Sequence, residues 1–112
     1  MEGLISTLAD PGDKTASLLA ALWVRIRPIV EERFATLDEA AAAAESGSLN
    51  AEVRGEGMSS AHKLAGSLGM YGFDEGTRIA REIEVLLGGA NPDALHLSRL
   101  IGELRASVFP DA

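Results

Sequence analysis

Residues 49–73, which read LNAEVRGEGMSSAHKLAGSLGMYGF, hold the pattern that decides the fold. Small and apolar residues recur in this segment at steps of three and four, the spacing of one helix face. The members of this stripe are Val53, Gly57, Ala61, Leu64 and Leu68. The spacing predicts a helix from about Leu49 to Met70 that buries the stripe.

The glycines of this segment are not explained by helix stability. Each of Gly55, Gly57, Gly66 and Gly69 costs about 1 kcal/mol relative to alanine inside a helix. Gly57 belongs to the buried stripe, where close packing explains it. Gly66 and Gly69 instead share the face of His62, because residues four and seven positions apart lie on one side of a helix. The sequence therefore predicts an exposed imidazole on a strip of small residues, open to an approaching protein.

The segment before residue 49 predicts one long helix, from about Thr15 to Glu45. Its apolar positions are Leu18, Leu22, Ile26, Ile29, Val30, Leu37 and Ala41. Pro28 cannot donate a hydrogen bond to the carbonyl of Val24, but the apolar spacing continues past it, so we expect a kink rather than a break. The run Ser46-Gly47-Ser48 predicts the end of this helix and the cap of the next.

Two shorter helices are predicted after residue 73. Asp74 is the expected cap of the first, and Gly88-Gly89 its end. Asn91-Pro92 is the expected start of the second, with the proline in the first helical position. The apolar stripes are Ile79, Ile83 and Leu86 in the first and Leu97, Leu100, Ile101, Leu104 and Val108 in the second.

Four helices and no convincing strand predict an all-α fold. Short connections favour antiparallel neighbours, so we expect an up-down-up-down four-helix bundle. The length of 112 residues suits a single domain, spanning residues 1–112. Within it, residues 1–12 are expected to form an arm or a short helical turn, which ends at the turn signal Asp10-Pro11-Gly12.

The composition, with 46% hydrophobic and 24% charged residues, is typical of a soluble globular protein. The net charge of −7 argues against nucleic acid and anionic membranes as partners. The absence of cysteine excludes disulfides and thiolate metal sites. No leader pattern or membrane-length apolar run is found, so we expect a cytoplasmic protein. The acidic charge and the lack of an obvious exposed heptad seam favour a monomer.

The run AHKLAGSLGMYGF at residues 61–73 resembles the signature of the histidine phosphotransfer (HPt) family. In that family a histidine is followed by a glycine four residues on, by further small residues and by a glycine at the helix end, here His62, Gly66, Gly69 and Gly72. The run RIAREIE at residues 78–84 resembles the start of the family's next helix. The resemblance implies a four-helix bundle whose exposed histidine is phosphorylated. It also implies exchange with the aspartate of a receiver domain, which holds the divalent metal.

One position departs from the family pattern. Members often carry a lysine three residues after the histidine, beside the phosphoryl group, whereas this chain has Ala65. Lys63 follows His62 directly, about 100° around the helix, so its ammonium reaches a phosphate less directly. This departure bears on the lifetime of the phosphohistidine more than on transfer itself.

Other chemistry around His62 is poorly supported. The positions three and four residues away hold Met58, Ser59, Ala65 and Gly66, so no metal ligand set is evident. A serine nucleophile at Ser59 or Ser60 would lack an orienting acid. The second histidine, His96, lies three residues after Asp93 and is expected to be an ordinary exposed side chain near a helix start.

The sequence therefore predicts a phosphorelay carrier in two-component signalling, modified on His62 rather than acting as a turnover enzyme. The supporting residues are Lys63, Gly66 and Gly69, and the expected docking face for receiver domains consists of Gly55, Met58 and Ser59. No cofactor is expected on this chain. Two alternatives stay open: the phosphorylated domain of a larger chemotaxis-type or hybrid histidine kinase, and a bundle that docks to receivers without phosphotransfer.

Overall fold

The computed structural model describes residues 11–110, with side chains from residue 14 onward. The described part contains four helices and no strand: α2 (Pro11–Glu45), α3 (Ala51–Met70), α4 (Asp74–Leu87) and α5 (Ala94–Val108). The predicted all-α class is thus confirmed. α2 begins four residues earlier than predicted and includes Pro11 and Gly12, while the rest of the predicted arm, residues 1–10, lies outside the described residues.

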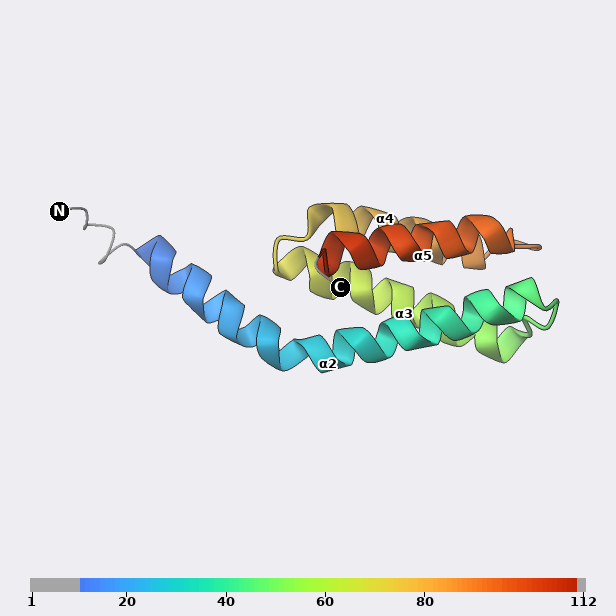
Figure 1. Cartoon of the computed structure of the whole chain (residues 1–112), viewed down its shortest axis with the longest axis horizontal. Coiled ribbons are helices and arrows are strands. Elements are labelled where there is room, and N and C mark those ends of the chain that lie inside the picture. Colours follow the sequence, from blue (N-terminus) through green and yellow to red (C-terminus); the bar gives the residue numbers. More distant parts are fainter. Residues whose placement is uncertain (1–10, 111–112) are drawn as a thin grey trace.

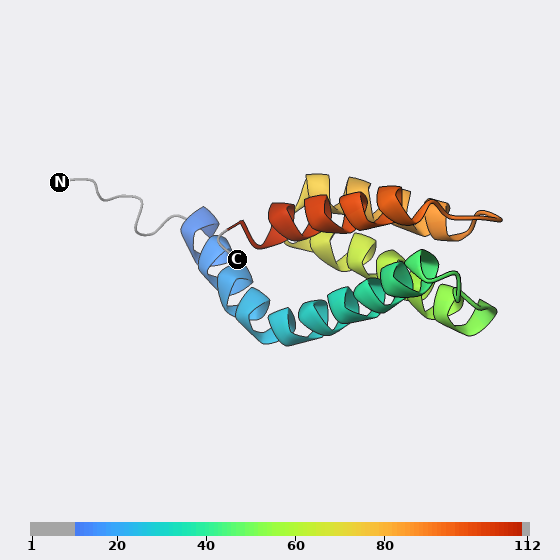
Figure 2. The same ribbon diagram turned by 45° about the vertical axis from the view of Figure 1, so that its right-hand side comes forward.

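The helices form a four-helix bundle. The ribbon reverses direction at each of the three connections (Figures 1 and 2). Both α2 and α4 pack against α3 and α5, so each helix has two neighbours. The molecule is 61 Å long but only about 20 Å across, because the first part of α2 projects beyond the other three helices (Figure 1).

The core follows the predicted stripes in α3, α4 and α5. Every stripe residue there is buried except Val53 and Leu86, which are half-buried. The largest fully buried side chains are Phe34, Leu37, Leu64, Leu68, Ile83, Leu87, Leu97, Leu104 and Val30. These side chains come from all four helices, so the bundle encloses one continuous core.

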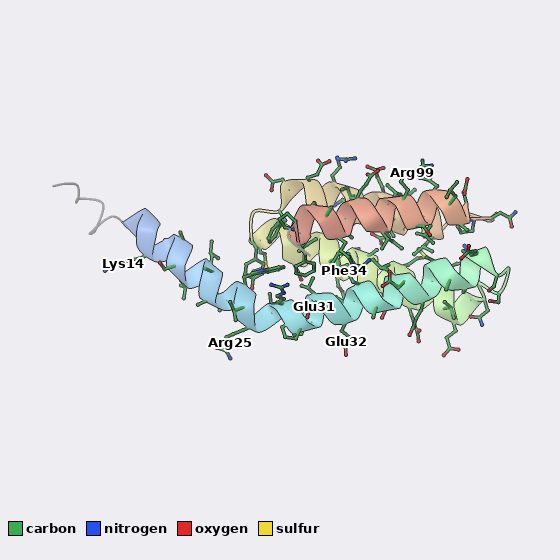
Figure 3. The ribbon with its side chains drawn as sticks, viewed as in Figure 1. Lys14, Arg25, Glu31, Glu32, Phe34 and Arg99 are labelled. Atoms are coloured by element: carbon green, nitrogen blue, oxygen red, sulfur yellow. The ribbon has the colours of Figure 1, made fainter. Side chains whose placement is uncertain are left out.

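α2 buries only two residues of its predicted apolar stripe, Val30 and Leu37, while Ile26 and Ala41 are half-buried and Ile29 is 41% exposed. The helix continues through Pro28, as predicted, and bends between Arg25 and Glu31 (Figure 3). Before the bend, Leu18 is 61% exposed and Leu22 is 39% exposed. The stripe predicted as continuous is therefore exposed near the start of α2, because the first part of this helix projects beyond the other three helices (Figure 1).

An aromatic cluster lies where the projecting half of α2 joins the bundle. The ring of Trp23 lies 4.9 Å from that of Phe73, 5.5 Å from that of Tyr71 and 6.1 Å from that of Phe109, measured between centroids. The guanidinium of Arg27 stacks on the Phe109 ring at 4.6 Å. Such tilted ring pairs stabilise a packing contact beyond the area they bury.

Three predicted helix caps are wrong. α3 is capped by Asn50, whose side chain accepts a hydrogen bond from the Val53 amide, and not by the run at residues 46–48. Asp74 lies inside α4, where Phe73 occupies the cap position without a side-chain bond. α5 is capped by Asp93, two residues after the predicted Asn91, because its carboxylate accepts from the amides of residues 95 and 96.

Candidate functional site

His62 lies in the middle of α3 on its outer face. Its side chain is 75% exposed, whereas Ala61 and Leu64 beside it are fully buried. The two faces of α3 thus divide as the stripe analysis predicted. The imidazole lies clear of the aromatic cluster and the core, so a second protein can reach it.

The His62 ring is held from one side by Glu84 of α4. His62 Nδ1 lies 3.2 and 3.3 Å from the two carboxylate oxygens of Glu84. With the proton on Nδ1, the ring donates to this carboxylate, and the lone pair is left on Nε2. The Glu84 side chain is 31% exposed, so solvent screens the pair only in part.

Sequence reasoning missed Glu84. It lies 22 residues from His62, so no helical spacing connects the two. Finding Glu84 requires knowing how α3 and α4 are aligned against each other, and the pattern of a single helix does not contain that alignment.

The glycines near His62 have different surroundings. A Cβ added at Gly66 or Gly55 would meet nothing within 4 Å, so both positions are open, as the approach argument requires. A Cβ at Gly69 would lie 3.3 Å from the Thr77 hydroxyl of α4. Close helix packing therefore accounts for Gly69, contrary to its placement on an open strip. At Gly57 a Cβ would lie 3.0 Å from Leu87, which confirms its packing role.

Ala65 lies in the seam between α3 and α4. It is 5% exposed, and its backbone carbonyl accepts a 2.9 Å hydrogen bond from the Thr77 hydroxyl. A longer side chain at this position would have to leave the seam toward solvent to place a charge beside His62.

Lys63 faces the opposite side, toward α2. It lines a shallow groove together with the carboxylates of Glu32, Glu52 and Glu56, and with Ser59. The negative charge of those carboxylates favours an ammonium on this side of α3, away from Glu84. The structure therefore weakens the case for Lys63 as a phosphate partner.

The expected docking face is only partly a free surface. Ser59 and Gly55 are exposed and share the groove with Lys63. Met58 is half-buried against the core, and its terminal methyl group would lie 3.2 Å from a Cβ added at Gly88 of the α4 end. Met58 thus belongs to the packing of α3 on α4 more than to an open face.

Among the described residues, neither the surroundings of His96 nor any group of possible metal ligands forms a second candidate site. His96 is exposed on α5, and its backbone amide donates to Asp93, which agrees with the expectation of an exposed side chain near a helix start. Within residues 14–110, no three His, Asp or Glu side chains converge as ligands of one metal ion. None of the described helices has the length and apolarity needed to span a bilayer.

Comparison with known proteins agrees with this geometry. The chain matches the model of a protein family described as the Hpt domain over residues 27–108, a range that contains His62 and Glu84. It is similar to Protein RcaC of Microchaete diplosiphon, with 32% identity over 82 residues. That similarity covers 70% of this chain but 13% of RcaC, so the chain spans a small part of the length of that relative. No solved structure matches.

Proposed function

Because this chain belongs to the Hpt domain family, we propose that His62 is the residue that takes a phosphoryl group from a receiver-domain aspartate and passes it on. Hpt domains carry phosphoryl groups in two-component phosphorelays rather than turning over a substrate, and they interact with receiver domains. The single observation that carries the assignment to His62 is its exposed ring, with Nδ1 against Glu84 and open space beside it at Gly66.

The chemistry divides between the two proteins. Nε2 of His62 attacks the phosphorus of the partner's aspartyl phosphate, a P–N bond forms, and the P–O bond to the aspartate breaks, releasing a carboxylate. The ring then carries a positive charge, with the proton still on Nδ1. The Glu84 carboxylate stabilises this charge by accepting the Nδ1 hydrogen bond. A divalent metal held by the receiver would stabilise the charge of the transferring group, and this chain contributes the nucleophile and its orientation.

The test is transfer from a phosphorylated receiver domain. We expect the wild-type chain to gain phosphate that is labile in acid and stable in base, and His62→Gln to gain none. His96→Gln is the matched control, because His96 is the other histidine and is also exposed, and it should gain phosphate like the wild type.

Two outcomes would overturn the assignment. Equal labelling of His62→Gln and wild type would show that another residue carries the phosphate. No labelling across a panel of receivers, while the chain still binds them, would replace transfer by docking alone.

A further inference from the structure

Phosphorylation of His62 would add negative charge to a site that already holds a carboxylate. A phosphoryl group carries a charge of about −1.5 to −2 at pH 7. It would stand on Nε2, while Nδ1 of the same ring lies 3.2 Å from the Glu84 carboxylate. The single positive charge of the modified ring offsets this negative charge only in part. A cation beside the phosphoryl group would therefore stabilise the phosphorylated chain.

Four lysine and arginine residues lie in α3 and α4, and three of them are engaged elsewhere. Arg54 donates to two backbone carbonyls at the end of α4. Arg78 is ion-paired with two glutamates of its own helix, and Lys63 lines the acidic groove toward α2. The fourth is Arg81, which is exposed and has no hydrogen-bond or ion-pair partner among residues 14–110.

Arg81 lies on the edge of α4 that follows α3. It comes four residues after Thr77 and three before Glu84, both of which bond to α3 through their side chains. At 3.6 residues per turn, Arg81 lies about 40° around the helix from Thr77 and about 60° from Glu84. Its neighbour Ala80 is fully buried, whereas Arg81 is exposed, so Arg81 is on the solvent side of this edge.

Two contacts place Arg81 along the length of the bundle. Glu84 meets His62, and the Thr77 hydroxyl would lie 3.3 Å from a Cβ added at Gly69. Seven residues of α4 therefore run back along seven residues of α3. Because Arg81 is three residues from Glu84, it lies about 4.5 Å along the helix axis from the level of His62.

The space between Arg81 and His62 is open. One turn after His62 on the same face is Gly66, where an added Cβ would meet nothing within 4 Å. Arg81 itself lines a shallow groove on the outer face of α4 together with Val85. Exposed side chains change rotamer within nanoseconds. The long stem of Arg81 can therefore carry its guanidinium across the glycine toward Nε2 of His62.

We propose that Arg81 binds the phosphoryl group of phosphorylated His62. Its guanidinium presents paired N–H donors, which match two phosphoryl oxygens. Glu84 and Arg81 then hold the modified ring from one helix, the carboxylate at Nδ1 and the guanidinium at the phosphoryl group. The charge that Ala65 does not supply comes from the neighbouring helix. The inference rests on the proposed function, because it requires His62 to be the phosphorylated residue.

The first test phosphorylates His62 without a receiver, with phosphoramidate as the donor. The phosphoryl group moves to the ring nitrogen, and ammonia leaves. The His96→Gln chain is used, so that His62 is its only histidine. Arg81→Gln should shorten the half-life of the phosphohistidine by about 3-fold to 10-fold, because a charge-assisted contact on an exposed surface is lost. Arg81→Lys keeps the charge and should keep most of the half-life.

A second measurement reports on the phosphoryl group itself. A bound guanidinium favours the dianion over the monoanion and so lowers the second pKa of the phosphoryl group. Arg81→Gln should therefore raise this pKa by about 0.3 to 1, which the ³¹P chemical shift followed against pH measures. A purely structural role of Arg81 would leave the pKa of the phosphoryl group unchanged.

Arg99→Gln is the matched control. It removes the same charge from an exposed arginine of α5, the helix that lies across the bundle from α3. We expect it to change neither the half-life of the phosphohistidine nor the pKa of the phosphoryl group.

Two results would overturn the inference. One is an unchanged phosphoryl pKa in Arg81→Gln, whatever the half-life, and the other is an equal effect of Arg99→Gln, which would indicate net charge alone. Both leave the proposed function standing if a receiver still labels His62. Labelling by phosphoramidate but by no receiver would overturn the proposed function alone, and a ring that accepts phosphate from neither donor would overturn both.

Discussion

The hydroxyl of Thr77 donates a 2.9 Å hydrogen bond to the backbone carbonyl of Ala65, which joins α4 to α3 one turn after His62. The same hydroxyl would lie 3.3 Å from a Cβ at Gly69. This side chain therefore contributes to both the spacing and the register of the two helices that carry the histidine and Glu84.

Thr77→Val should lower the free energy of unfolding by about 1 kcal/mol, because the carbonyl of Ala65 loses its partner in a half-buried seam. Urea denaturation measures this change. Thr36→Val is the control, since the Thr36 hydroxyl bonds only to a carbonyl of its own helix, and it should change stability by less than about 0.5 kcal/mol. Equal losses in the two variants would contradict the assigned role.

Glu84→Ala should slow phosphoryl transfer to His62 by about 3-fold to 30-fold, because the ring loses the acceptor that favours a proton on Nδ1. Rapid-quench kinetics give the rate, and ¹⁵N chemical shifts of the imidazole give the tautomer. Glu82→Ala removes a carboxylate that instead bonds Arg78, and should leave both readouts unchanged. A wild-type tautomer ratio in Glu84→Ala would show that Glu84 does not position the ring.

Alanine at two glycines of α3 should have opposite effects. Gly66→Ala should stabilise the chain by up to about 1 kcal/mol, because alanine favours helix and the space there is open. Gly57→Ala should destabilise it by about 1–3 kcal/mol, because the added methyl group meets Leu87 and Ala40. Thermal unfolding compares the two, and a destabilised Gly66→Ala would show that this position is not open.

Ala65→Lys should lengthen the half-life of the phosphohistidine, because an ammonium leaving the seam beside His62 can pair with the phosphoryl group. Decay of the isolated, radiolabelled protein measures it. Lys63→Ala is the comparison, and we expect little change in half-life, because Lys63 lies on the side of the α2 groove. A shorter phosphohistidine half-life in Lys63→Ala than in the wild type would show that Lys63 does stabilise the phosphoryl group.

Local patterns predicted the parts of the fold that depend on one helix at a time. The α3 stripe from Gly57 to Leu68 and the exposure of His62 follow from the helical period alone, and both are confirmed. The caps were less predictable, since Asn91 and Asp93 are both good cap residues two positions apart, and only the chain path selects Asp93.

Features that depend on two helices could not be read from the sequence. Glu84 meets His62 only through the register of α3 and α4. Gly69 faces Thr77 for the same reason. The exposure of Leu18 and Leu22 depends on where the other helices end, which no local pattern contains.

Trp23 is the only tryptophan of the chain, and it stands among the aromatic rings where the projecting part of α2 meets the bundle. Its emission therefore originates from one place. Time-resolved fluorescence anisotropy of the unlabelled protein would separate the tumbling of the whole molecule from motion where α2 meets the bundle. The motion of α2 can therefore be followed without attaching a dye.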